Sequence, residues 1–156
     1  MLRGLIASLI VVSLCVVIHV CGLLLLADWL LRHPVKQEPQ FNIRRYSSLL
    51  ISVFAVITLL HLLETFVWGG LYYWWGHFPD FETCWYFSLG SYTTIGYGDV
   101  VLPVKWRLVG GIEGINGVLL CGLSAAFLFG IVNNMFESRE KLRDELSTSA
   151  VETTTR

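Results

Sequence analysis

The chain has 156 residues, of which 54% are hydrophobic and only 15% are charged, and its formal net charge is −1. With a mean hydropathy of +0.62, it is too apolar for an ordinary soluble domain. It also lacks the basic patches that bind nucleic acid. We therefore expect an all-α membrane protein that contacts lipids and has no nucleic-acid partner.

The first long apolar segment lies near the start of the chain. No charged residue interrupts residues 4–27, a length sufficient for one transmembrane helix. This run is longer than the apolar region of a signal peptide, which has about 7–15 residues, and no small-residue cleavage site follows it. We therefore predict that residues 1–31 form a retained transmembrane helix that packs at the periphery of the protein.

A polar linker and a second span come next. Residues 32–45 contain two prolines and more basic than acidic side chains. The second span begins near Tyr46, stays uncharged as far as Glu64 and ends near Trp68. The aromatic-rich residues 69–79 that follow are typical of a loop at a membrane interface.

Residues 83–98 form another uncharged run, which is too short to cross a bilayer comfortably. We predict a re-entrant helix, capped by Asp80 or Thr83, followed by an extended return. The return contains the Thr/Gly segment, residues 93–99, which reads Thr-Thr-Ile-Gly-Tyr-Gly-Asp. Its alternating glycines allow positive φ angles, so successive carbonyl groups can point the same way. A row of carbonyls at membrane depth is tolerated only where it is buried in protein or lines a water-filled path.

The last span begins near Trp106 and ends near Phe136. The tail over residues 137–156 mixes both charges, and we expect a short helix that frays. Positive charge in the linker and after the last span marks both as cytoplasmic. Three spans then place the N-terminus and the Thr/Gly segment outside the cell and the C-terminus in the cytoplasm. The compactness of the chain suggests a prokaryotic inner membrane.

The order of span, re-entrant helix, Thr/Gly segment and span resembles the pore module of potassium channels over residues 46–136. The resemblance implies a selectivity filter whose backbone carbonyls replace the water shell of K+. The implied filter residues are Thr94, which adds its hydroxyl, Ile95, Gly96, Tyr97 and Gly98, and the first four of these bind K+. Gly98 and Asp99 would form the outer mouth, and the Tyr97 side chain would brace the filter against the re-entrant helix.

Each chain holds a single filter segment, so the resemblance also implies a homotetramer. It implies a passive potassium-selective channel with no catalytic activity and no cofactor beyond the permeant K+. Two other interpretations stay open, a weakly selective cation channel and a non-conducting regulatory channel subunit. No span carries the regular arginine repeat of a voltage sensor.

The sequence departs from the family pattern behind the filter. Similar channels carry two tryptophans where this chain has Tyr86 and Phe87, and others carry a glutamate where it has Gly90. Both familiar braces for Asp99 are therefore expected to be missing, which puts the stability of the conducting filter in doubt. In the last span, Gly117 stands where similar channels place a gating hinge, although a close-packing role is the alternative.

Ionisable residues inside the spans are functional hypotheses by default. His61 and Glu64 share one helix face, and a rise of about 1.5 Å per residue places His61 and Glu113 at the same depth. We predict that His61 meets Glu113, and that Glu64 meets Arg107 or the re-entrant helix. These contacts would support the filter from behind. His19 lies alone in the first span and is expected to pack there or to bond to the backbone.

Other roles for these polar residues stay open. Glu64 could snorkel outward while Glu113 faces a wet crevice, and His61 could act as a pH sensor. A metal site built on His61 and Glu64 would have too few ligands. Asn116 and Ser124 are expected to form hydrogen bonds between helices, with exposure to a central cavity as the alternative.

Overall fold

The computed structural model describes residues 2–32 and 43–154, and all regular structure in these ranges is helical. The elements in chain order are α1 (Leu2–Arg32), α2 (Ile43–Trp74), α3 (Phe81–Tyr92), the short 3₁₀ helix η1 (Val104–Trp106) and α4 (Arg107–Thr154). α1, α2 and the first part of α4 are long and apolar enough to cross a membrane. The expected all-α membrane fold is confirmed, whereas most of the predicted linker over residues 32–45 lies outside the described residues.

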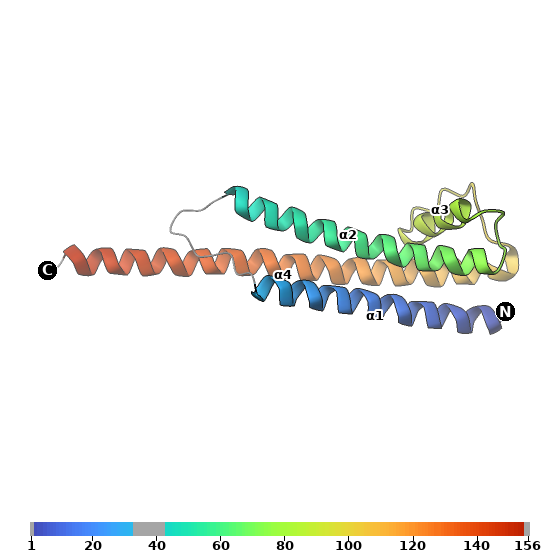
Figure 1. Cartoon of the computed structure of the whole chain (residues 1–156), viewed down its shortest axis with the longest axis horizontal. Coiled ribbons are helices and arrows are strands. Elements are labelled where there is room, and N and C mark those ends of the chain that lie inside the picture. The colour runs from blue at the N-terminus through green and yellow to red at the C-terminus, as the bar shows by residue number, and fades with distance from the viewer. Residues whose placement is uncertain (1, 33–42, 155–156) are drawn as a thin grey trace.

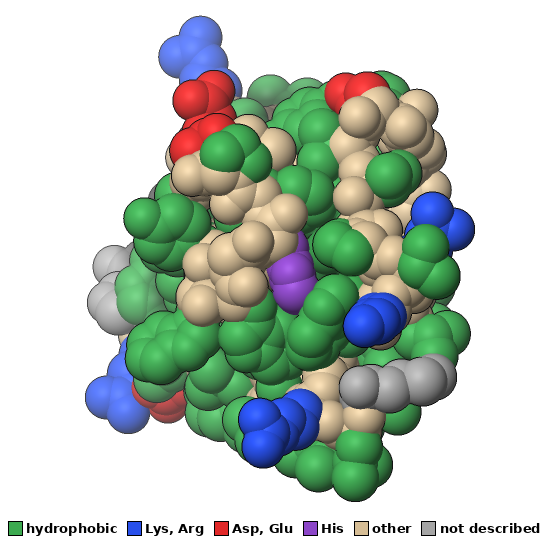
Figure 2. All heavy atoms as spheres, turned by 90° about the vertical axis from the view of Figure 1, so that its right-hand side faces the viewer, with side chains coloured by type: hydrophobic (Ala, Val, Ile, Leu, Met, Phe, Trp, Pro, Cys, Tyr) green, Lys and Arg blue, Asp and Glu red, His purple; other side chains and the backbone are tan. Residues whose placement is uncertain are grey.

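The three long helices lie side by side, with α3 at the end of the molecule where α1 begins (Figure 1). α1 and α4 run in one direction and α2 runs in the opposite direction. Glycines let α1 approach its neighbours closely, because a Cβ on Gly4 would come within 2.5 Å of Trp106, and one on Gly22 within 2.5 Å of Leu60. The start of α1 and the Thr/Gly segment therefore share one end of the molecule. Figure 2 shows hydrophobic side chains over much of this end, interspersed with backbone, polar and charged groups.

Two helices are longer than the sequence suggested. α2 continues past Trp68 to Trp74, so the first half of the predicted aromatic loop is helical. α4 runs unbroken to Thr154, which corresponds to roughly 70 Å at the usual helical rise. The short helix expected over the tail therefore continues the last span without a break, and α4 extends well beyond α1 and α2 (Figure 1).

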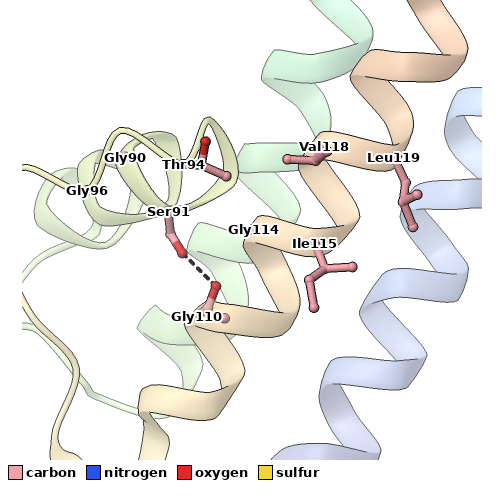
Figure 3. Close-up of a pocket in the computed structure, with 10 residues that line it drawn as sticks. Gly90, Ser91, Thr94, Gly96, Gly110, Gly114, Ile115, Val118 and Leu119 are labelled. Atoms are coloured by element: carbon pink, nitrogen blue, oxygen red, sulfur yellow. Dashed lines mark hydrogen bonds between the residues drawn. The ribbon is translucent and has the colours of Figure 1, made fainter.

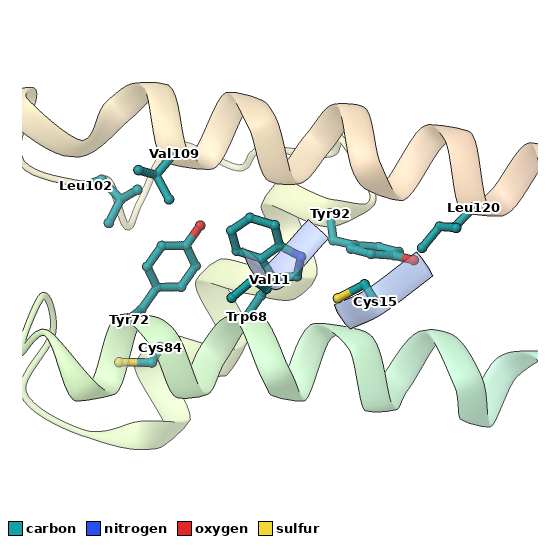
Figure 4. Packing of buried hydrophobic residues seen from close by; sticks show 9 residues of the cluster. All are labelled: Val11, Cys15, Trp68, Tyr72, Cys84, Tyr92, Leu102, Val109 and Leu120. Carbon is teal, nitrogen blue, oxygen red and sulfur yellow. The ribbon is translucent and has the colours of Figure 1, made fainter. Parts of the chain in front are cut away.

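The interior is built from a few aromatic residues and small side chains. Trp68 and Tyr72 of α2 and Cys15 of α1 are fully buried, and Tyr92 of α3 is 2% exposed. They meet between α2 and α4 (Figure 4). Only 22% of the most apolar stretch of each long helix is buried within the chain. The remaining apolar surface is available to lipid or to other copies of the chain.

α3 has 12 residues and is too short to cross a bilayer. Asp80 caps its first turn, as the sequence predicted, by accepting hydrogen bonds from the Thr83 amide at 2.7 Å and the Thr83 hydroxyl at 3.0 Å. The helix ends at Tyr92, and the Thr/Gly segment follows directly. α3 packs against both α2 and α4, which fixes the position from which this segment starts.

Candidate functional site

Successive residues of the Thr/Gly segment alternate between positive and negative φ angles. Thr94, Gly96 and Gly98 have positive φ angles of 60°, 53° and 80°, whereas Ile95 and Tyr97 between them do not. This confirms that both glycines are used for conformations that side chains disfavour. Among the described residues, Thr94 alone carries a side chain at positive φ, which costs about 1 kcal/mol or more and is typical of functional sites.

Hydrogen bonds fix the start of the segment, while its carbonyl groups stay open. The Gly96 amide donates to the Gly90 carbonyl at 3.0 Å, and the Thr94 amide donates to Ser91 at the same distance. Residues 93–99 are exposed. In the part of the chain that the structure describes, no donor reaches the carbonyl oxygens of residues 94–97. Four consecutive carbonyls are thus free to bind water or a cation.

Asp99 accepts a hydrogen bond from Tyr86, a role that the comparison with similar channels did not predict for this residue. The Tyr86 hydroxyl donates to Asp99 Oδ2 at 2.7 Å, and the rings of Tyr86 and Tyr97 stack with centroids 6.2 Å apart. The two familiar braces are absent at Phe87 and Gly90, as expected, but Asp99 is nevertheless supported, because the Tyr86 hydroxyl supplies a donor. This hydrogen bond holds the pKa of Asp99 below its usual value and raises the pKa of Tyr86. Phe87 packs against Tyr72 instead.

Behind the segment, five polar side chains from four helices form a closed ring of hydrogen bonds, here called the polar ring. Its members are His19 of α1, His61 and Glu64 of α2, Tyr92 of α3 and Ser124 of α4. His19 Nδ1 lies 2.8 Å from Glu64 Oε1, and the Tyr92 hydroxyl donates to Glu64 Oε2. His61 Nδ1 lies 2.9 Å from the Tyr92 hydroxyl. Ser124 Oγ closes the ring at 3.0 Å from His19 Nε2 and 3.1 Å from His61 Nε2.

The polar ring is withdrawn from solvent. His19 and Glu64 are fully buried, Tyr92 and Ser124 are 2% and 4% exposed, and the His61 side chain is 20% exposed. Glu64 thus does not snorkel, and of its two predicted partners it meets α3 rather than Arg107, which is exposed. The expectation that His19 packs or bonds to the backbone is wrong as well, because its ring nitrogens meet the side chains of Glu64 and Ser124. α1 contributes a polar side chain to the centre of the protein.

Glu113 belongs to a separate cluster. It is fully buried and accepts hydrogen bonds from the Tyr72 hydroxyl at 2.6 Å and from Ser88 Oγ at 2.5 Å. The predicted meeting of His61 with Glu113 is therefore wrong, and so is a wet crevice around Glu113. Counted from the observed helix ends, Trp74 for His61 and Arg107 for Glu113, their depths differ by about 10 Å at 1.5 Å per residue. The error came from ending α2 at Trp68.

Gly117 lies where α4 crosses the end of α3. A Cβ on Gly117 would come within 2.0 Å of the Tyr92 carbonyl oxygen, which is far inside contact distance. The close-packing role is therefore established for Gly117, while a gating hinge stays a prediction. Ser124 forms hydrogen bonds between helices, as expected, whereas the buried amide nitrogen of Asn116 has no hydrogen-bond partner among the described residues.

The polar ring also contains possible metal ligands. Ligand atoms of His19, His61 and Glu64 lie within 4.8 Å of one another, and imidazole with carboxylate is a donor set that transition metals accept. The structure thus adds His19 to the two ligands suggested by the sequence. Each of these donor atoms is, however, already paired with another member of the ring, so the cluster is complete as a hydrogen-bond network.

Sequence reasoning missed two tyrosines, Tyr86 and Tyr92, because aromatic residues in a membrane protein are usually assigned to packing or to the interface. The position of Tyr92 in the sequence could have indicated its role. Tyr92 directly precedes the Thr/Gly segment, so any partner of its hydroxyl acts next to that segment. His19 offered a second signal, since a lone histidine in an apolar span needs a buried partner.

Comparison with known proteins agrees with the site. Residues 60–134 match a family model described as an ion channel. No curated protein and no solved structure matches the chain. The matched region runs from the second half of α2 through α3 and the Thr/Gly segment into α4. Over residues 60–134, the chain is therefore similar to members of an ion channel family.

Proposed function

We propose that four copies of this chain form a potassium-selective channel that conducts K+ passively across the cell membrane. The observation that carries the proposal is the alternating backbone of the Thr/Gly segment, with positive φ at Thr94, Gly96 and Gly98. An alternation of this kind lets the carbonyls of residues 94–97 point toward one side, where they and the Thr94 hydroxyl would replace the hydration shell of K+. The segment is then the selectivity filter, with Asp99 at its outer mouth.

A homotetramer follows from the coordination that a dehydrated cation requires. One chain supplies a single carbonyl to each layer of the filter, so the site is incomplete until other copies contribute theirs. A groove of about 570 Å³ beside Thr94 supports this assembly (Figure 3). Its walls include the following small or apolar residues: Gly90, Ser91, Gly96, Gly110, Gly111, Gly114, Ile115, Val118 and Leu119. We assign this groove to a second copy of the chain, because glycine walls let another backbone approach closely.

The electrostatics of α3 favour a cation near the filter. Its N-terminus carries Asp80 and Glu82, which complement the positive end of the helix dipole. Its C-terminus, at Tyr92, presents partial negative charge at the entrance to the Thr/Gly segment. In a tetramer, four such helix ends would together stabilise a K+ ion on the cytoplasmic side of the filter.

The orientation follows from charge and from the arrangement of the helices. The basic linker and the basic start of the tail mark the cytoplasmic side. The start of α1 and the filter share the opposite end (Figure 1), so the N-terminus and the outer mouth lie outside. The part of α4 beyond Glu137 then extends roughly 25 Å into the cytoplasm at the usual helical rise.

The proposal is tested by reconstituting the purified full-length protein into liposomes loaded with K+. A potassium channel releases K+ when an ionophore supplies counter-charge, and barium, a divalent ion close in size to K+, blocks the release. Empty liposomes are the control for leak. An absence of barium-sensitive flux would favour the non-conducting subunit, and equal flux of Na+ would favour the weakly selective channel.

A further inference from the structure

The five links of the polar ring require a specific number of protons. Each link joins two electronegative atoms, so each needs one proton between them. Neutral His19, neutral His61, Tyr92 and Ser124 supply one proton each, which makes four. An ionised Glu64 supplies none. The closed ring therefore holds one further proton, carried either by the Glu64 carboxyl group or by the histidine pair.

In either position, the additional proton makes the polar ring neutral. Charge at membrane depth is costly, and no Lys or Arg side chain among the described residues pairs with Glu64, whose oxygens contact His19, Tyr92 and His61. The other titratable groups near Glu64 are thiols, Cys15 on α1 and Cys121 on α4, and neither supplies a positive charge. The shared proton is thus the means by which this buried carboxylate is neutralised.

The ring controls the position of the residue just before the filter. Tyr92 is the last residue of α3, its hydroxyl belongs to the ring, and its carbonyl lies against Gly117. The Thr94 amide in turn bonds to Ser91 in the same last turn. Movement of the Tyr92 side chain would therefore displace the beginning of the Thr/Gly segment.

We propose that His19 of α1 is a positioning residue for the filter, acting through Glu64 and Tyr92, and that this positioning requires the closed ring of hydrogen bonds. α1 is then a functional part of the pore rather than a peripheral packing helix. The statement about the filter rests on the proposed channel function. The statement about the ring stands on its own, so the two are tested by different readouts.

The first test does not require conduction. Amide hydrogen exchange is measured by mass spectrometry on the full-length protein in lipid nanodiscs, over peptides that contain the end of α3. His19→Ala opens the ring, and exchange there should become about tenfold faster, as expected when a buried hydrogen bond to a carboxylate is lost. The control is Val17→Ala, because Val17 lies on α1 and is 58% exposed. Equal exchange in the two variants would overturn the coupling of α1 to the filter.

The second test exploits the proton count. Glu64→Gln supplies a permanent N–H donor and a carbonyl acceptor, so all five links form without the additional proton, whereas Glu64→Ala removes two links. We expect Glu64→Gln to keep the slow exchange at the end of α3 and the K+ flux, and Glu64→Ala to lose both. A loss in Glu64→Gln as large as in Glu64→Ala would show that the carboxylate charge itself is required, as for a metal ligand, and would overturn the proposal.

The two readouts separate the ring from the channel. Failure of K+ flux alone, with the exchange results as expected, would contradict only the channel function.

Discussion

The carbonyl oxygen of Tyr92 lies against Gly117, so closely that a Cβ at position 117 would sit 2.0 Å from it. This contact joins α3 to α4 at the start of the Thr/Gly segment. The hydroxyl of the same tyrosine donates to Glu64, which joins α3 to α2 and, through His19, to α1. One residue thus connects the Thr/Gly segment to all three long helices.

The contact predicts that Gly117→Ala destabilises the protein. The obstacle is backbone rather than a flexible side chain, so α4 has to move away from α3, which costs about 1–3 kcal/mol. Thermal unfolding of the detergent-solubilised protein should show a lower midpoint. Gly122→Ala is the control, since a Cβ at Gly122 on the same helix meets nothing within 4 Å. Equal midpoints for the two variants would show that the contact does not exist.

Glycine at position 96 is required for its backbone conformation and not for space. A Cβ at Gly96 or at Gly70 meets nothing within 4 Å, but Gly96 has a φ of 53° while Gly70 lies within α2. Gly96→Ala should therefore abolish K+ flux in liposomes, and Gly70→Ala should preserve it. Flux retained by Gly96→Ala would rule out the alternating backbone as the conducting structure.

Tyr86 should set the sensitivity of the outer mouth to acid. Its hydrogen bond holds the pKa of Asp99 below the usual value, so the stabilisation from this carboxylate is present above the ordinary Asp pKa and is lost as the pH falls through the lowered value. Tyr86→Phe removes the donor and raises the pKa of Asp99. Inhibition of current by external acid should then begin at a higher pH than in the wild type.

The acid titration has an internal control. Asp99→Asn removes the titrating carboxyl group, so the part of the inhibition due to Asp99 should vanish in this variant. If Tyr86→Phe and the wild type show the same acid titration, the hydrogen bond between Tyr86 and Asp99 has no role in the mouth.

The buried Glu113 carboxyl group depends on Tyr72. Tyr72→Phe keeps the ring but removes one of two hydroxyl donors to Glu113, and an unsatisfied buried acceptor costs about 1–3 kcal/mol. The unfolding midpoint should fall. Tyr73→Phe, the same change at a neighbouring residue that is 54% exposed, should leave the midpoint unchanged. A similar effect of both substitutions would argue against the buried cluster around Glu113.

Local signals in the sequence were sufficient for the helices and for the backbone of the Thr/Gly segment. The cap at Asp80 and the positive φ angles at Gly96 and Gly98 depend on residues within a few positions of one another. The residue pairs behind the Thr/Gly segment could not be predicted, because they depend on where each helix ends. Extending α2 from Trp68 to Trp74 shifts its residues by about 9 Å, which is enough to exchange the partners of His61.

The residues that support Asp99 and the Thr/Gly segment also could not be predicted from the pattern of similar channels. A tyrosine hydroxyl at position 86 performs the donor role that the pattern assigned to tryptophan, and the carbonyl of Gly90 binds the Gly96 amide where a side chain was expected. Side-chain chemistry can be replaced in this way whenever another residue supplies a donor at the same place. Only the three-dimensional arrangement reveals such a replacement.

The central claim, that four Thr/Gly segments select K+, is tested most directly by the reversal potential of single channels in a planar bilayer with K+ on one side and Na+ on the other. The account predicts a reversal potential strongly shifted in the direction of a membrane permeable to K+ alone, and unchanged in Gly70→Ala. A reversal potential near zero would mean that Na+ passes as readily as K+ and would contradict the account.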